Sequence, residues 1–463
     1  MLQPRTSRGT MAEFDLCLRG RLVLPDRIIE DGHVAVRDGA IALVGEGAMP
    51  AARARHDLRG LWIMPGAIDG QTHACNQLDH EGIGRASRAA AAGGVTSFVD
   101  MPYDEPVPIT DAARFSAKAA VVAADAHVDV GLYATIAPAE GCAHLDALLA
   151  AGALAFKFST YEAHPTRFPR ITDDLLHAAF ARLAPSGLLC AVHNQDQEMS
   201  RRAIDAAVAA GNVGPDAYAG ALPPLVEDLA TARIFELGAI TGARAHAVHV
   251  STGRGLALAA AYRAMGHAIS AETCVQYLML TDQDVARLGA RAKHYPPIRP
   301  AAETERLWEG VIDGQCGFVS SDHASWALAH KQDPSFFACA AGGPGLETLL
   351  PAFWTGCAER GLGPLLVARM LAEGPAASFG LARKGRIAVG CDADFAVLEP
   401  GRFVHDASRA QAAVQWSAFD GRAMAVRVAA SFVRGLCVWD GGAIVGPAGH
   451  GRLLRPGDTD AIN

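Results

Sequence analysis

Short apolar segments separated by glycine and aspartate turns open the chain. Asp15–Leu22 and His33–Val36 are examples. Runs of this length between turn residues are typical of β-hairpins. A comparable pattern returns near the end, at Asp394–Leu398 and Ala425–Val438. We therefore expect the two ends of the chain to pair into one small β-sandwich.

Between these ends, short apolar runs alternate with alanine-rich stretches of helical composition. Val95–Met101 is followed by Asp111–Ala124 and then by Val128–Ala134. This alternation predicts βα units. Repeated over the whole middle of the chain, it predicts a (β/α)8 barrel with its active site at the carboxyl ends of the strands. The predicted fold class is therefore α/β, a TIM barrel with a small β-sandwich domain formed by the N- and C-terminal segments.

The same patterns set the expected domain boundaries. A second methionine, Met11, lies just before the first patterned segment. The residues that precede this segment are therefore expected to be a disordered extension that takes no part in the fold. The expected divisions are 1–11 for the extension, 12–64 and 378–440 for the two parts of the β-sandwich domain, 65–377 for the barrel and 441–463 for a C-terminal tail.

Composition narrows the class of function. Of the 463 residues 50% are hydrophobic and 19% charged, and the formal net charge is -8. This composition is typical of a compact globular enzyme, and the charge gives no general attraction to nucleic acid or to an anionic membrane. Ten cysteines occur without CxxC pairs, which indicates reduced thiols. No apolar segment has the length of a signal or membrane-spanning segment, so we expect a cytoplasmic location and a small-molecule substrate.

Polar side chains that could bind a metal end several of the predicted strands. Imidazole and carboxylate groups are donors that divalent cations accept. A lysine contributes only as a neutral amine or as a carbamate; otherwise Lys157 would be one half of a buried ion pair. A lone histidine at a strand end is more often a hydrogen-bonded core residue than a ligand. The prediction of a metal site therefore depends on several such residues occurring together. Its members are Asp69, Gln71, His73, Lys157, His193, His249 and Asp322.

The segment Pro65–His73 resembles the opening motif of the amidohydrolase superfamily, Pro-Gly-x-Ile-Asp-x-His-x-His. His73 stands at the second histidine, and Gln71 replaces the first. Further motifs resemble the branch of cyclic amidohydrolases that includes dihydropyrimidinases, hydantoinases and allantoinases. They follow in the family's order, at Ala91–Thr96, Phe156–Phe158, Glu272–Cys274, Ser321–Ala324 and Gly343–Thr348.

This resemblance implies a metal centre. A carbamylated Lys157 would bridge two divalent metals, usually zinc in this branch. His193 and His249 would hold one metal, and His73 with Asp322 the other. A hydroxide bridging the metals would attack the amide carbonyl, and Asp322 would pass its proton to the leaving nitrogen as general base and acid. The neutral amide of Gln71 is a poorer donor to zinc than imidazole. The second position should therefore be weakened, which leaves one or two ions.

The residues around this centre bear on the substrate. Dihydroorotases carry an arginine two positions after the second histidine, where it can pair with a carboxylate; here Cys75 disfavours that substrate. Tyr161, soon after Lys157, is the candidate for stabilising the oxyanion and contacting the substrate. Gln276, where the family usually has histidine, and His323 are further candidates for substrate contact. Arg167 in the following loop would suit an acidic substituent, or else is a solvated charge.

The leading hypothesis is thus a hydrolase that cleaves a C–N bond in a hydantoin-, dihydropyrimidine- or allantoin-like ring. One alternative is a catalytically silent homologue that acts as a scaffold, suggested by Gln71 and Gln276. Another is a one-metal hydrolase of acyclic N-acyl or carbamoyl groups. Retention of Lys157 and Asp322 favours an enzyme, because such groups are costly to bury without a function. By resemblance alone, a homodimer or homotetramer is expected.

Overall fold

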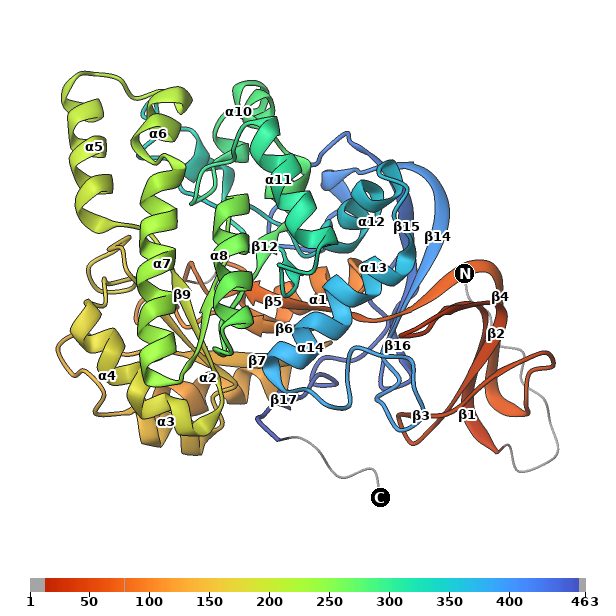
Figure 1. Cartoon of the computed structure of the whole chain (residues 1–463). Coiled ribbons are helices and arrows are strands. Elements are labelled where there is room, and N and C mark those ends of the chain that lie inside the picture. The colour runs from red at the N-terminus through yellow and green to blue at the C-terminus, as the bar shows by residue number, and fades with distance from the viewer. Residues whose placement is uncertain (1–12, 79, 458–463) are drawn as a thin grey trace.

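The two ends of the chain build one sheet beside a helix-covered barrel (Figure 1). The computed structural model describes residues 13–78 and 80–457. The expected N-terminal extension, 1–11, lies outside the described residues. The sheet has seven strands in the order β16-β15-β14-β4-β1-β2-β3. These strands are β1 (Phe14–Val23), β2 (Ile28–Arg37), β3 (Ala40–Glu46), β4 (Ala52–Pro65), β14 (Phe395–Val404), β15 (Ala423–Val433) and β16 (Leu436–Trp439).

The pairing of the chain ends is confirmed by the contact between β4 and β14. These strands run antiparallel, with Phe395 opposite Pro65 and Leu398 opposite Trp62. Apolar side chains alternate with polar ones along β1, as expected for a strand with one buried face. The buried side chains from both ends share one core, so neither half forms the domain without the other.

Eight parallel strand positions form the barrel. Seven strands, from β5 to β11, are paired in consecutive order. Glu272 separates β11 from β12, which pairs in parallel with β13, and a bridge between Thr72 and His323 joins this last strand to the first. The strands are β5 (Ala67–Thr72), β6 (Val95–Asp100), β7 (Asp129–Ala134), β8 (Ala155–Ser159), β9 (Leu189–His193), β10 (Arg244–Ala247), β11 (Ser270–Ala271), β12 (Thr273–Cys274) and β13 (Val319–Ser320).

Helices cover the outside of these strands. Asp111 and Asp196 begin α2 and α5, where each side chain accepts a hydrogen bond from a backbone N–H of the first turn. The helices are α1 (Gly82–Ala92), α2 (Ala112–Asp125), α3 (Leu145–Ala151), α4 (Asp173–Leu183), α5 (Gln197–Ala209), α6 (Pro215–Ala221), α7 (Pro224–Thr241), α8 (Gly253–Ala264), α9 (Val275–Met279), α10 (Asp282–Leu288), α11 (Ala301–Ile312), α12 (Leu349–Glu359), α13 (Pro364–Ala368) and α14 (Gly374–Phe379).

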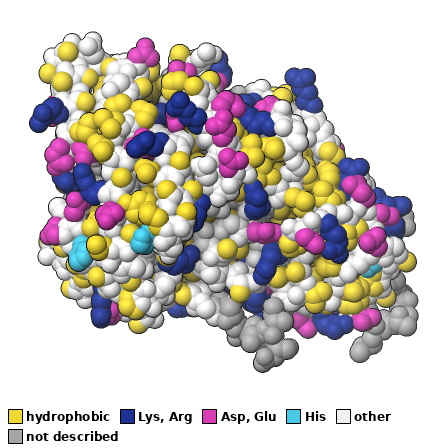
Figure 2. Space-filling model, viewed as in Figure 1, with side chains coloured by type: hydrophobic (Ala, Val, Ile, Leu, Met, Phe, Trp, Pro, Cys, Tyr) yellow, Lys and Arg dark blue, Asp and Glu magenta, His cyan; other side chains and the backbone are white. Residues whose placement is uncertain are grey.

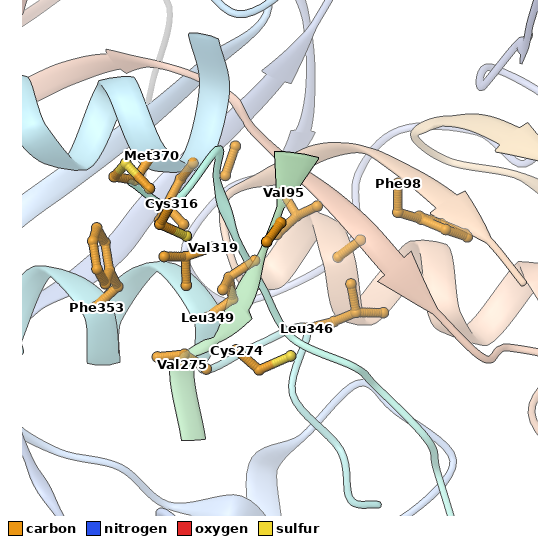
Figure 3. Close-up of a cluster of buried hydrophobic side chains, with 14 of the residues drawn as sticks. Val95, Phe98, Cys274, Val275, Cys316, Val319, Leu346, Leu349, Phe353 and Met370 are labelled. Atoms are coloured by element: carbon orange, nitrogen blue, oxygen red, sulfur yellow. The ribbon is translucent and has the colours of Figure 1, made fainter. Parts of the chain in front are cut away.

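The main core lies between the barrel strands and these helices. Figure 3 shows part of it, where Val319 of β13 lies near Leu349 and Phe353 of α12. The ring of Phe353 also stacks on Trp308, with 5.5 Å between the ring centroids. Burying a side chain of this size contributes roughly 1.5–3 kcal/mol. The core therefore holds the strand ends, and the side chains that follow them, in fixed positions.

The C-terminal segment differs from the expected tail. β17 (Leu453–Leu454) pairs in parallel with β7, with Leu453 opposite Val130. The segment thus adds a strand to the barrel sheet, a long-range pairing that its short apolar pattern did not indicate. Among the described residues, no helix combines the length and apolar character that crossing a bilayer needs. Acidic and basic side chains are interspersed over the face drawn in Figure 2.

Candidate metal centre and active site

One cavity of about 420 Å³ collects most of the residues that the strand-end pattern singled out. They follow different strands, and the barrel brings them to the same end because parallel strands all finish there. Residues that are far apart in the sequence can therefore line the same cavity. The cavity is lined by Gln71, His73, Lys157, Tyr161, His193, His249 and Asp322.

His193 and His249 face one another across this cavity. Nδ1 of His193 lies 2.8 Å from Nε2 of His249. Burial, and after it the Lys157 charge, lowers the pKa of His193 to about 3, while burial and His193 hold the pKa of His249 well below its ordinary value. Both rings are therefore neutral at pH 7. Neutral imidazole nitrogens that converge in this way fit the donor set of a divalent cation.

Lys157 is buried, with its amine beside the two histidines. Its Nζ has no hydrogen-bond partner among the described residues. Burial lowers the pKa of Lys157 to about 7, against the opposing influence of Asp322 and Glu272. A substantial fraction of the amine is therefore unprotonated near neutral pH, which is the form that carbamate formation requires. The residues present fit a carbamylated, metal-binding lysine.

Asp322 lines the same cavity and has two neighbours from β5 and its end. Nε2 of the Gln71 amide donates to Oδ1 of Asp322 over 2.8 Å, and Nε2 of His73 lies 3.5 Å from the same oxygen. Oε1 of Gln71 is buried and has no hydrogen-bond partner among the described residues. That oxygen is the one donor atom with which Gln71 could still contact a cation.

The backbone is strained at two of these positions. Asp322 has φ of 48° and His249 has φ of 42°. Residues other than glycine rarely adopt this left-handed conformation, and such strain collects at functional sites. Asp69 supports the turn before Asp322, because its carboxylate accepts hydrogen bonds from Ser321 N (2.8 Å), Ser321 Oγ (2.6 Å) and Thr72 Oγ1 (2.7 Å).

Two of the expected substrate contacts lie elsewhere. His323 is fully buried; its Nε2 lies 2.8 Å from Glu81 Oε2, and its Nδ1 accepts the backbone N–H of Gly345. Gln276 is buried in α9, with its Nε2 3.5 Å from His294 Nδ1. Neither side chain is among the described residues that line the cavity. Because the buried partners of His323 occupy both ring nitrogens, we correct its expected substrate contact to a structural one.

Apart from Tyr161, the sequence analysis did not single out the aromatic side chains that line the cavity. Tyr295 stacks on His193, with ring centroids 5.6 Å apart and planes 22° apart, and meets Tyr161 edge to face. Nε2 of Gln195 donates to its hydroxyl over 3.0 Å. No periodicity marks these residues, because their loops come together only in the closed barrel. The aromatic lining comprises Tyr103, Tyr161, Phe168, Tyr218, Tyr295, Trp326 and Phe337.

Two other clusters of acidic and thiol groups have donor atoms within 4.8 Å of one another. One contains Cys75, Asp100 and Asp104, and Nζ of Lys118 lies 2.5 Å and 2.6 Å from the two carboxylates. The other contains three aspartates around Lys384. In each cluster the carboxylates are already paired with a buried ammonium, joined in the second cluster by Arg434 and Arg383, so neither is favoured as the metal site.

Comparison with known proteins adds independent information. The model of the Amidohydrolase family matches residues 62–437. An allantoinase of Rubrobacter xylanophilus is 37% identical over 451 residues, covering 96% of this chain and 98% of that protein. An allantoinase of Deinococcus radiodurans is 34% identical over 448 residues, covering 96% and 99%.

A solved structure, the L-hydantoinase (dihydropyrimidinase) from Arthrobacter aurescens, superposes with a TM-score of 0.92 at 28% identity. The superposition covers 96% of this chain and 100% of the L-hydantoinase chain. A D-hydantoinase gives 0.87, also at 28% identity. With the strand order described above, these likenesses confirm the predicted TIM barrel and its accessory β-rich domain.

Proposed function

The chain belongs to the amidohydrolase family, and on that premise we propose that it hydrolyses a C–N bond of a cyclic amide or ureide. The observation that carries this proposal is the meeting of His73, Lys157, His193, His249 and Asp322 in one cavity. The names of its relatives, allantoinase and hydantoinase, point to ring opening. Several donor atoms there are buried without a partner, which would be costly in a purely structural site.

We propose that His193, His249 and a carbamylated Lys157 hold one divalent ion, with zinc the expected metal. His73 and Asp322 would hold a second ion more weakly, because Gln71 offers only an amide oxygen where imidazole is expected. When bound, such an ion supplies Lewis acidity, which polarises the amide carbonyl and acidifies water. Zinc, the carbamate and assembly as a homodimer or homotetramer stay predictions from the resemblance. A cytoplasmic location stays a prediction from the apolar pattern of the sequence.

Asp322 is proposed to move the proton. The amide of Gln71 donates to its Oδ1 and so fixes the orientation of the carboxylate. A carboxylate at this position can accept a proton from the attacking water and return it to the ring nitrogen as the C–N bond breaks. The tetrahedral oxyanion needs a hydrogen-bond donor, and the Tyr161 hydroxyl is our candidate because the side chain lines the same cavity.

The role of Tyr161 can be tested by replacing it with phenylalanine. Tyr161→Phe should lower kcat by about 100-fold, the usual cost of one oxyanion donor, with little change in metal content. Turnover equal to that of the unaltered enzyme would leave Tyr161 as a packing residue against Tyr295.

The decisive experiment is elemental analysis of protein produced with zinc and bicarbonate, followed by a substrate panel. We expect one or two metal ions per chain and hydrolysis of allantoin, hydantoin or dihydrouracil. Hydrolysis confined to N-carbamoyl or N-acyl amino acids would favour the acyclic alternative. Correctly folded protein that stays metal-free and inactive would favour the silent homologue.

A further inference from the structure

Besides Lys157, three lysine and arginine side chains are among the described residues that line the active-site cavity, and they differ in what they bind. Lys293 donates to the carbonyl oxygens of Phe337 (3.0 Å) and Cys339 (2.5 Å). Arg201 stacks on Tyr161 and pairs with Glu162 over 3.8 Å. The Arg167 side chain donates one hydrogen bond, from Nη1 to the carbonyl oxygen of Asn76 at 2.7 Å. It makes no ion pair within 4.0 Å among the described residues.

The Arg167 guanidinium is half-buried, which removes water that would otherwise solvate it. Burial lowers the pKa of Arg167, partly offset by the more distant charges of Glu105 and Asp104. Its position next to the cavity therefore has an unbalanced positive charge. A carboxylate entering the cavity would supply the missing counter-ion in a two-pronged geometry that guanidinium favours.

The loop that carries Arg167 is held in place before any ligand binds. His164 and Phe168 form an antiparallel bridge, and the backbone N–H of Arg167 donates to His164 Nδ1 over 3.1 Å. Phe168 packs edge to face on Tyr103, with 3.8 Å between ring centroids, and on His193. A fixed arginine loses less conformational entropy on binding than a mobile surface arginine does.

The partner of Arg167, Asn76, shows a second unbalanced group. The residue is 4% exposed and lines the cavity, yet neither Oδ1 nor Nδ2 of its side chain has a hydrogen-bond partner among the described residues. Leaving a buried amide unpaired costs roughly 1–3 kcal/mol. A primary amide offers one acceptor beside one donor, which matches the C=O and N–H edge of a cyclic amide.

We propose that the substrate is a cyclic amide bearing an anionic substituent, with Arg167 binding the anion and Asn76 binding the amide edge of the ring. This inference rests on the proposed function and specifies its substrate class. In the sequence, Cys75 disfavoured dihydroorotate alone, because it stands where dihydroorotases carry an arginine, and Arg167 was already a candidate for an acidic substituent. In the structure, the guanidinium of Arg167 contacts Asn76, the residue that follows Cys75, although the two lie 91 positions apart in the sequence.

The test compares two ring compounds that differ only in a carboxylate. Orotate and uracil are planar, are not opened by hydrolysis and can be titrated calorimetrically into the metal-loaded enzyme. We expect orotate to bind at least about tenfold more tightly than uracil, and Arg167→Met to remove that difference. Asn76→Ala should weaken both ligands by a similar factor, because both present an amide edge.

A matched control lies on the same loop. Arg170 is paired with Glu198 over 2.6 Å and is not among the residues lining the cavity. Arg170→Met should therefore leave both dissociation constants within about twofold. Equal binding of the two ligands, no binding of orotate, or equal effects of the Arg167 and Arg170 variants would each overturn the anion site.

Measurements of turnover distinguish a failure of the anion site from a failure of the proposed hydrolase activity. The values of kcat/KM are compared for dihydroorotate with dihydrouracil, and for hydantoin-5-acetate with hydantoin. Hydrolysis of the neutral rings without preference for the acids would overturn the anion site and leave ring opening standing. If no ring is opened but orotate binding still depends on Arg167, the proposed function fails while the anion site holds.

Discussion

Two buried lysines of this chain have opposite surroundings. Lys384 pairs with Asp129 (2.8 Å), Asp392 (3.1 Å) and Asp394 (2.7 Å), where the barrel meets the β-rich domain. Lys157 has no hydrogen-bond partner among the described residues. Both are shielded from water, but only the first has its charge balanced.

The difference shows in their ionisation. Burial lowers the pKa of both, yet the three carboxylates more than reverse this for Lys384, whose pKa is raised, whereas the pKa of Lys157 falls to about 7. Lys384 is therefore a permanent cation that joins two parts of the fold. For Lys157, the neighbouring carboxylates do not fully offset the cost of removing the charged amine from water. Such an uncompensated cost is expected at a site where the amine reacts or contributes to metal binding.

Of the changes considered, removing Lys157 should lower activity most. Lys157→Met is expected to lower kcat/KM by about 1000-fold or more, because the proposed metal ligand would be removed and the metal lost with it. The free energy of unfolding of the metal-free protein should stay equal or rise. Elemental analysis and urea unfolding check the two parts. A variant that keeps its metal and turnover would contradict the assignment of Lys157.

Removing the paired lysine should instead affect stability. In Lys384→Met, Asp129 keeps its partner Arg434 and Asp392 keeps Arg383. Asp394 is left buried without an ion-pair partner among the described residues, which is expected to lower the free energy of unfolding by about 3–5 kcal/mol. Urea unfolding measures the change. The metal content and kcat of the fraction that remains folded should be unchanged. Intact stability together with lost activity would reverse the roles given to the two lysines.

Gln71 offers a smaller change on the side of the centre opposite Lys157. Gln71→His supplies the imidazole that the family motif has at this position, and should raise affinity for the second ion by about tenfold. Competition with a chelator, read as ions retained per chain, tests this. Gln71→Asn is the matched control, since it keeps the amide and should not gain an ion.

The smallest effect is a difference in pH dependence between the lysines. The folded-state pKa of Lys157 lies below its unfolded value of about 10.4, so the unfolded chain binds more protons between pH 7 and 10. Its destabilising contribution is thus fully present below about pH 7 and is relieved as the pH rises, by at most about 1.4 kcal/mol per pH unit.

For Lys384 the folded pKa is raised, so its stabilising contribution persists over this whole range and is lost only at higher pH. Urea unfolding of metal-free wild type, Lys157→Met and Lys384→Met at pH 7 and pH 10 tests the contrast. Only the difference between wild type and Lys157→Met should change. Parallel changes in both differences would show that the two lysines are not distinguished by their surroundings.

The sequence by itself determined the architecture and the candidate ligands. Apolar runs and helical segments are encoded in neighbouring residues, so their alternation predicted the barrel. Side chains that follow predicted strands, such as His193 and Asp322, could be assigned to one end of it. The contact of His323 with Glu81 could not be predicted in this way, because the two residues lie 242 positions apart.

Only the tertiary structure decided which buried groups are paired. The sequence placed Lys157 at the end of an apolar run but left open whether it is paired in a buried salt bridge. The carboxylates that pair with Lys384 instead come from β7 and from residues just before β14. The contact of Arg167 with Asn76, the stacking of Tyr295 on His193 and the return of β17 to the barrel likewise join distant segments. Such pairings depend on how the barrel closes, and no local pattern of hydrophobic and polar residues specifies the partner across that distance.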